Sequence, residues 1–439
     1  MEPQPALPKP ITPFARAMRN AGYLLGGSGI GAIFGFLTTI FAARQLGLRD
    51  YGILLLIHSF TGALATGTRL QTWQPMLQFG TALSEALART RLQTLLRHCL
   101  LLDGVGALAA VAIGIPVSIF CSHLLGLAGY ERATAVYLTC ALFMNTGATI
   151  GVMRITDRYK MAVVADNLSA FIRFGGAVLG FWLHWNLTVF LTFWYFSIVA
   201  AFLADGVLLW RLTKLTPSLA GFRLTGGPWR SQEIGFWKLL LPTSIDQALI
   251  SLASRIDILI IGSLLGGAGA ALYRVATQVS DALMQPAVFL SPALYPEFVR
   301  LREQRDWASL RKMTWRICRL LSVFSAPVLV IIYFAGSTIL AAMLGKHIPH
   351  TRDLLLWLTV ASIIGLWSIP LEPLLISLGR AKTVLHGRVW FLLLSLPLFY
   401  VLTRTYSVEG AAIVVFIRSA AIFTTRLVPF LMMSETKLP

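Results

Sequence analysis

Long apolar runs, separated by short polar segments, fill the sequence from residue 20 to residue 432. Several of these runs exceed the roughly 18 apolar residues with which a helix crosses about 30 Å of hydrocarbon. The pattern predicts an all-α, polytopic membrane protein with about twelve transmembrane helices. The predicted spans are residues 20–42, 52–76, 98–120, 134–153, 162–183, 187–210, 238–264, 268–295, 315–341, 354–377, 384–403 and 409–432.

The longest polar segment lies midway along the chain, between Arg211 and Glu233, and it is rich in glycine, proline and threonine. Such residues interrupt helices, so the segment is predicted to link two halves. The predicted organisation is an N-terminal tail (1–19), a six-helix lobe (20–212), a cytoplasmic linker (213–235), a second six-helix lobe (236–433) and a C-terminal tail (434–439).

Short motifs recur in the two halves at a nearly constant offset. "QLGLRDYG" after the first span resembles "LLGGAGAALY" after the seventh, which pairs Gly47 with Gly266. Two further pairs follow in the same order, Arg97 with Arg311 and Arg158 with Arg380. We therefore expect two pseudo-symmetric six-helix lobes around a central cavity, as in transporters with parallel repeats. Chance similarity among hydrophobic helices is the alternative.

The chain is 56% hydrophobic and only 13% charged, with a net charge of +18. With both termini in the cytoplasm, twenty-six of the 37 Lys and Arg residues fall in cytoplasmic segments and six in outer loops. This split satisfies the positive-inside rule. The basic excess is thus explained by topology, with membrane lipids as partners and no nucleic acid. No cleavable signal is expected, because the first 13 residues are a proline-rich tail without an apolar core.

The four cysteines show neither a CxxC motif nor a Cys/His spacing typical of metal sites. We interpret them as packing residues and expect no metal site and no cofactor.

Charged residues nevertheless lie inside apolar spans. Residues 254–286 contain Arg255, Asp257, Arg274 and Asp281, although each ionised group at bilayer depth costs about 2.5–3.5 kcal/mol on insertion scales. Span 238–264 has a polar half that includes Asp246 and Asp257. One face of span 268–295 is polar at positions i, i+4, i+7 and i+11, and these residues are Arg274, Gln278, Asp281 and Gln285.

Similar charges occur in other spans. Arg69 shares a helical face with His58 in span 52–76, and Arg173 and Arg418 lie in the fifth and twelfth spans. Polar faces inside a membrane require either a dry network of interhelical ion pairs or a water-filled cavity. The length and recurrence of the polar faces favour a cavity with cationic walls. His58 either lines this cavity or is an ordinary hydrogen-bonded core residue.

Guanidinium groups suit phosphate, because they bind it bidentately and keep their proton. The predicted contacts to a substrate headgroup are Arg69, Arg173, Arg255, Arg274, Arg418, Gln278 and Gln285. A desolvated carboxylate can exchange H⁺ or Na⁺, so Asp246, Asp257 and Asp281 are the candidates for ion coupling. Asp103 and Asp205, near predicted cytoplasmic helix ends, are expected to be interfacial.

Several motifs resemble those of one known family. "FAARQLGLRDYG" is similar to a signature after the first helix of polysaccharide transporters and O-antigen flippases. "IDILIIGSLLG", followed by "LSPALYPEF", resembles the region of their seventh and eighth helices, and "ISLGRAKTV" resembles the connector before the eleventh. These families belong to the multidrug/oligosaccharidyl-lipid/polysaccharide exporter superfamily.

The resemblance implies two lobes around a cavity that opens alternately to each side of the bacterial cytoplasmic (inner) membrane. It also implies a lipid-linked substrate, an undecaprenyl-pyrophosphate oligosaccharide, which is turned from the cytoplasmic to the periplasmic leaflet. Further expected partners are a polysaccharide polymerase and glycosyltransferases, and we expect a monomer. Peptidoglycan-precursor flippases usually have two more C-terminal helices, whereas this chain ends after twelve.

Two other functions compete. A multidrug and toxin extrusion-type cation antiporter shares the fold but tends to place carboxylates in the cavity, and the first span has no acid between Arg19 and Asp50. A membrane enzyme needs catalytic groups in a sizeable outer segment. The predicted outer loops are short and hold no cluster of histidines and carboxylates, so we expect neither an enzyme nor catalytic residues.

Overall fold

The computed structural model describes residues 13–85, 88–231, 233–282, 298, 301, 302, 304, 306–346, 348, 351–378 and 381–432. The regular elements of these residues are all helices, which confirms the all-α prediction. The first lobe contains α1 (Pro13–Gly67), α2 (Trp73–Glu85), α3 (Arg89–Phe120), α4 (Glu131–Leu138), η1 (Thr139–Phe143), α5 (Gly147–Ile155), α6 (Tyr159–Trp182) and α7 (Leu187–Leu215). They are followed by η2 (Pro217–Leu219), α8 (Phe236–Ala282), α11 (Trp307–Leu344), α12 (Thr351–Ser377) and α13 (Ala381–Leu431).

Three of the long helices each contain two spans. The described residues include nine stretches long and apolar enough to cross a membrane, but α1, α8 and α13 are interrupted by non-helical backbone at Gly47, Gly266 and Tyr406–Ser407. Across the first interruption, the Tyr51 hydroxyl donates to Thr39 Oγ1 at 3.1 Å. With these three helices counted twice, the described residues contain twelve spans, in agreement with the prediction of about twelve.

Gly47 and Gly266 have nearly the same conformation, with φ of 73° and 69° and ψ of 171° and −170°. Only glycine adopts this region readily. They are also the two residues that the sequence repeat pairs. The equal turns therefore support a duplicated six-helix unit.

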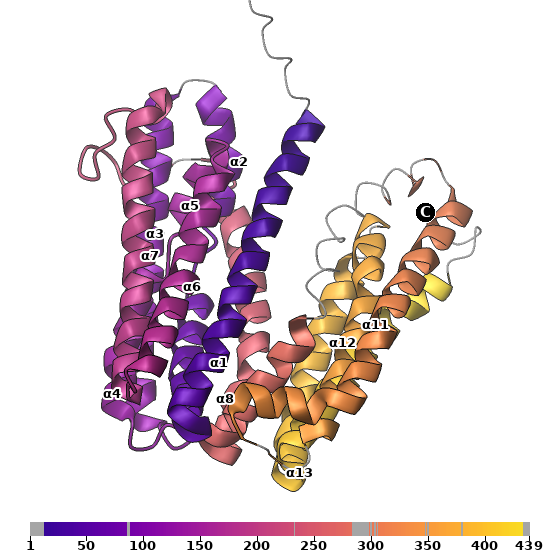
Figure 1. Cartoon of the computed structure of the whole chain (residues 1–439). Helices are drawn as coiled ribbons and strands as arrows, with labels where there is room; N and C mark the ends of the chain where they lie inside the picture. Colours follow the sequence, from indigo (N-terminus) through magenta and orange to yellow (C-terminus); the bar gives the residue numbers. More distant parts are fainter. Residues whose placement is uncertain are drawn as a thin grey trace, which may run out of the picture.

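The two lobes converge at one end and separate at the other (Figure 1). Helices α1–α7 form one bundle and α11–α13 the other, and α8 lies between them, against α1. At the converging end the backbones of α1 and α8 touch, because a Cβ on Gly52 would lie 1.7 Å from the carbonyl oxygen of Gly267. The lobes separate on the side from which the N-terminal end of α1 projects.

Two predicted spans are interrupted. The second, predicted over 52–76, ends as a helix at Gly67 and resumes at Trp73 as α2. The fourth, predicted over 134–153, consists of α4, η1 and α5, with a break before Gly147. Interruptions of this kind are tolerated at membrane depth only where other protein groups satisfy the freed backbone.

Helix α3 begins nine residues before the predicted span 98–120, because the linker covers its first turns. Arg97 Nε donates to the Arg223 carbonyl at 2.9 Å, and Arg91 forms an ion pair with Glu233 at 2.8 Å. Arg89 also donates to the carbonyl of Ala220. The linker is thus fixed to the first lobe.

Candidate functional site

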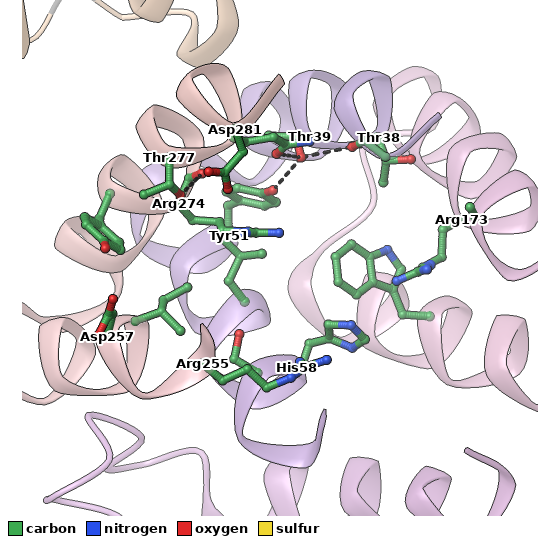
Figure 2. Close-up of a pocket in the computed structure, with 18 of the residues that line it drawn as sticks. Thr38, Thr39, Tyr51, His58, Arg173, Arg255, Asp257, Arg274, Thr277 and Asp281 are labelled. Atoms are coloured by element: carbon green, nitrogen blue, oxygen red, sulfur yellow. Dashed lines mark hydrogen bonds between the residues drawn. The ribbon is translucent and has the colours of Figure 1, made fainter. Parts of the chain in front are cut away.

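A cavity of about 640 Å³ lies between the lobes. Residues from α1, α6 and α7 line it on one side, and residues from α8 and α13 line it on the other. Figure 2 shows the α1, α6 and α8 residues around it. Its walls are polar in the middle of an otherwise apolar protein. Such convergent polar groups in a cavity between domains are the usual mark of a ligand site.

Arginines dominate the charge of the cavity. The four arginines known to line it come from three helices, and among the side chains that the structure describes only two aspartates, Asp257 and Asp281, line it with them. The arginines are Arg173 on α6, Arg255 and Arg274 on α8, and Arg418 on α13.

One arginine is neutralised within the second lobe. Arg418 Nη1 and Nη2 donate to the two carboxylate oxygens of Asp257 at 3.0 and 2.5 Å. The bidentate geometry and the burial of Asp257 make this a strong, charge-assisted pair. It ties α13 to α8 and leaves little of the Arg418 charge for a ligand.

The other three arginines have no carboxylate at ion-pair distance among the described side chains. Arg173 donates from Nε to the Ser169 carbonyl at 3.2 Å and lies 5.6 Å from the Trp194 ring. Arg255 reaches from α8 towards α1 (Figure 2) and fits because Gly62 has no side chain, since a Cβ there would lie 2.3 Å from Nη1. Arg274 interacts with Asp281 through space only.

Hydrogen bonds connect the two lobes beside these charges. Thr39 on α1 donates to Gln278 Oε1 on α8 at 2.8 Å, and Thr39 itself accepts from Tyr51. Ser251 on α8 donates to Thr66 on α1 at 2.7 Å. These bonds lie along the same α1–α8 contact that closes one end of the cavity.

His58 turns out to be both a cavity-lining residue and a hydrogen-bonded one. It lines the cavity, and its Nδ1 lies 2.9 Å from the Tyr137 hydroxyl, edge-to-face with Trp194 at 5.1 Å. The two readings that the sequence left open are therefore compatible.

The cavity contains most of the residues that the helical pattern selected. Arg173, Arg255, Arg274, Arg418, Gln278, Asp257 and Asp281 all line it. Gln285 lies outside the described residues. Their roles in binding and coupling stay predictions.

Two selected residues lie elsewhere. Arg69 is in the break between α1 and α2, beside Asp103, because the helix on which its predicted face depended ends at Gly67. Asp246 is exposed and does not line the cavity. Asp246 shares a helical face with Asp257, but it lies three turns nearer the start of α8. It is therefore away from Arg418, the arginine that forms the ion pair with Asp257.

The sequence pattern missed several aromatic residues and two acids. Tyr51, Trp194 and Tyr273 line the cavity, but aromatic residues in apolar helices give no distinct signal. Asp103 and Asp205 were both expected at the membrane interface, whereas both are buried between helices, with 4% and 9% of the residue exposed. The early start of α3 accounts for the error at Asp103, because it places this residue in the middle of the helix.

No group of three or more His, Cys, Asp or Glu side chains suited to a metal ion occurs among the residues that the structure describes. The four cysteines are free thiols.

The comparisons with known proteins agree with the resemblance seen in the motifs. The profile of a family described as "Polysaccharide biosynthesis protein" matches residues 187–348. The "Inner membrane protein YghQ" of Escherichia coli (strain K12) is 26% identical over 310 residues, which cover 67% of this chain and 84% of that protein.

Solved structures share the fold at low identity. A multidrug resistance MATE family transporter of the MOP superfamily, in an inward-facing conformation, has a TM-score of 0.69 at 14% identity, over 91% of this chain and 93% of the other. The Lipid II flippase MurJ, in an inward closed conformation, has a TM-score of 0.65 at 13% identity, over 92% and 87%. A MOP superfamily transporter from Pyrococcus furiosus, described as having a binding pocket of reversed polarity, has a TM-score of 0.58 at 14% identity, over 95% and 94%.

Proposed function

We propose that the chain is a transporter of the polysaccharide flippase type and that it moves an undecaprenyl-pyrophosphate-linked oligosaccharide across the bacterial inner membrane. The partial match to the polysaccharide biosynthesis family, the similarity to YghQ and the fold shared with MATE and MurJ structures support this proposal. The direction proposed is from the cytoplasmic to the periplasmic leaflet. With both termini in the cytoplasm, the lobes separate on the cytoplasmic side, where such a substrate is made.

A single observation carries the proposal, namely three cavity guanidinium groups without a carboxylate partner among the described side chains. Arg173, Arg255 and Arg274 come from both lobes, so a doubly charged headgroup between them would contact both. Arg173 and Arg255 are partly buried. Holding unpaired cations in such a place costs free energy, and a pyrophosphate would offset that cost. Guanidinium donors match phosphate oxygens in geometry as well as in charge.

The proposed cycle needs no chemical step. The headgroup enters between the separated lobes while the polyprenyl tail stays in the lipid. Pairing with arginines of both lobes favours their closure, and rocking of the lobes then exposes the headgroup on the other side. A charge that moves through 100 mV supplies about 2.3 kcal/mol, which is enough to bias such a cycle.

Cation efflux is the alternative, because multidrug exporters share the fold. Asp281 is the one lining carboxylate without a hydrogen-bonded arginine among the described residues. An excess of arginine nevertheless repels an organic cation. The two functions therefore predict opposite ligand preferences for the same cavity.

Binding of undecaprenyl pyrophosphate to the purified protein in detergent tests the proposal, with uncharged undecaprenol and the organic cation ethidium as comparisons. We expect the pyrophosphate to bind more tightly than either. Arg255→Gln and Arg274→Gln should each weaken it about tenfold or more, because a hydrogen bond to a charged group contributes about 1.5–3 kcal/mol.

Arg132→Gln is the matched control, since Arg132 is an exposed arginine at the start of α4, outside the cavity. It should leave the affinity unchanged. Equal binding of undecaprenol, or undiminished binding in both cavity variants, would contradict the proposal, and preferential binding of ethidium would support cation efflux instead.

A further inference from the structure

Asp103 on α3 lies where the interruptions of two spans meet. Its Oδ1 accepts a hydrogen bond from the Thr72 hydroxyl, at the end of the first break, at 2.6 Å. Its Oδ2 accepts from the backbone N–H of Ala148, in the first turn of α5 after the second break, at 2.7 Å. One carboxylate thus holds both interrupted spans.

The fit is close, and glycine permits it. A Cβ on Gly147 would lie 2.2 Å from Thr72 Oγ1 and 3.1 Å from Asp103 Oδ1. A Cβ on Gly106, one turn along α3 from Asp103, would lie 2.7 Å from the Thr68 carbonyl oxygen. The breaks and α3 are therefore packed directly on one another around the carboxylate.

Two polar atoms at this place have no hydrogen-bond partner. Asn145 donates from Nδ2 to the backbone carbonyl of Asp103 at 3.3 Å, but its Oδ1 is buried and unpaired, and the residue is only 6% exposed. Arg69 Nε is also buried and unpaired. A buried acceptor and a buried donor left open beside a carboxylate indicate a group that changes its hydrogen bonds, since such atoms are otherwise satisfied.

The first break also contacts the other half of the protein. The backbone N–H of Gln71, one residue before Thr72, donates to Ser244 Oγ on α8 at 2.9 Å. Gln71 Oε1 accepts from Trp73 Nε1 at 2.7 Å. A rearrangement of Thr72 would therefore act directly on one of the hydrogen bonds that hold α8 against the first lobe.

We propose that Asp103 is a proton-binding site of the first lobe and that its protonation releases α8 from the break in the second span. Protonation changes one carboxylate oxygen from an acceptor into a donor and removes the negative charge opposite Arg69. A proton on Oδ1 forces the hydrogen bond from the Thr72 hydroxyl to reverse or to break, and the break between α1 and α2 can then change shape. Interrupted helices hold coupling ions in other transporter folds for the same physical reason.

The charged surroundings favour a proton over a metal cation. Among the described residues, the charged and titratable groups that act on Asp103 are Arg69, from the first break, and Cys99, one turn earlier on α3. A bound proton and a bound Na⁺ each add one positive charge beside the Arg69 guanidinium. The proton forms a covalent bond to the carboxylate and leaves a neutral group, whereas a metal ion stays charged beside the guanidinium and needs further oxygen ligands. The inference does not depend on which substrate the cavity carries.

Hydrogen–deuterium exchange of the full chain in lipid nanodiscs tests it without any substrate. Exchange is measured from pH 8 down to pH 5, with labelling times corrected for the pH dependence of intrinsic amide exchange. As the pH falls, the amides of 68–72, 145–150 and 244–252 should lose protection together. We expect an increase in exchange of about 3- to 10-fold, the size expected for loss of one hydrogen bond.

Three variants separate the steps. Asp103→Asn should show high exchange in these segments at every pH. Ser244→Ala removes the acceptor of the Gln71 amide, so it should raise the exchange of this amide at every pH. It should keep the pH response of 145–150 but lose that of 244–252. Asp306→Asn, which changes a carboxylate at the start of α11 outside the cavity, should respond like the wild type.

Other results would overturn the proposal. These are pH-independent exchange in the wild-type breaks, or the same pH response in Asp103→Asn. Protection that depends on sodium chloride rather than choline chloride at constant pH would assign the site to a metal cation instead. Ser244→Ala provides the test if Asp103→Asn fails to fold.

Discussion

At the scale of single residues, the arginines of the cavity differ in how free their charges are. Arg418 is held by two hydrogen bonds to Asp257. Arg255 instead extends to α1 and lies against Gly62, where its guanidinium occupies the space of a missing side chain. The position of this charge therefore depends on a glycine of the opposite lobe as much as on its own helix.

Gly62→Ala should reduce the affinity for undecaprenyl pyrophosphate about as much as Arg255→Gln does. The new Cβ would lie 2.3 Å from Arg255 Nη1, so the guanidinium must move. Gly104→Ala is the control, because a Cβ at this exposed helical position meets nothing within 4 Å. Binding to the purified proteins measures the effect, and wild-type affinity in Gly62→Ala would show that the position of Arg255 does not matter.

Helical periodicity predicted the faces of the cavity well where the helix continued and poorly where it stopped. The α8 residues Arg274, Gln278 and Asp281 lie together as their spacing requires. Arg69 does not, because its backbone leaves the helix after Gly67. Asp103 was misplaced because contacts between α3 and the linker, which extend that helix, are invisible in a local pattern.

At the scale of helices, the glycine turns at Gly47 and Gly266 set the path of the chain. Both residues have a positive φ with an extended ψ, and each connects two successive spans of its lobe. Such turns keep the connections very short, which brings Tyr51 back onto Thr39. The two turns thereby position cavity residues in both halves.

Gly47→Ala and Gly266→Ala should each destabilise the protein by about 1–3 kcal/mol, because a side chain strains this backbone conformation even where space is available. Neither position has an atom within 4 Å of a new Cβ, so the effect would come from the backbone alone. The apparent melting temperature in detergent measures it.

Gly206→Ala serves as the control for both turns. Gly206 is exposed on α7 with nothing within 4 Å of its Cβ position, and alanine in a helix is favoured by roughly 0.5–1 kcal/mol. Melting temperatures that fall equally at all three positions would contradict the role of the turns.

Hydropathy predicted the number of spans but not their interruptions. Hydropathy averaged along a predicted span does not distinguish residues 68–72 and 144–146 from helical ones. The reason is that the residues on either side of each break are as apolar as those of an intact helix. What permits the breaks is the carboxylate of Asp103 in a third helix, which bonds Thr72 and Ala148. Such a tertiary contact has no signature in the sequence of either interrupted span.

At the scale of the whole molecule, the two lobes are held at one end by the α1–α8 contact and are apart at the other (Figure 1). The closed end is stabilised by the direct approach of Gly52 to Gly267 and by a shared apolar core that includes Ile57, Ile261 and Val275. If the lobes rock during transport, this contact must open. Its stability then sets the balance between the two orientations of the cavity.

Gly52→Ala should shift that balance towards opening at the end that is closed here. A Cβ at residue 52 would lie 1.7 Å from the Gly267 carbonyl oxygen, a backbone atom that cannot rotate away. In a background without native cysteines, a single cysteine at the buried cavity position Thr39 reports the change. Its labelling by a membrane-impermeant maleimide added outside intact cells should rise in Gly52→Ala and stay unchanged in Gly206→Ala. Equal labelling in all backgrounds, with Gly52→Ala still monodisperse on gel filtration, would show that this crossing does not control access to the cavity.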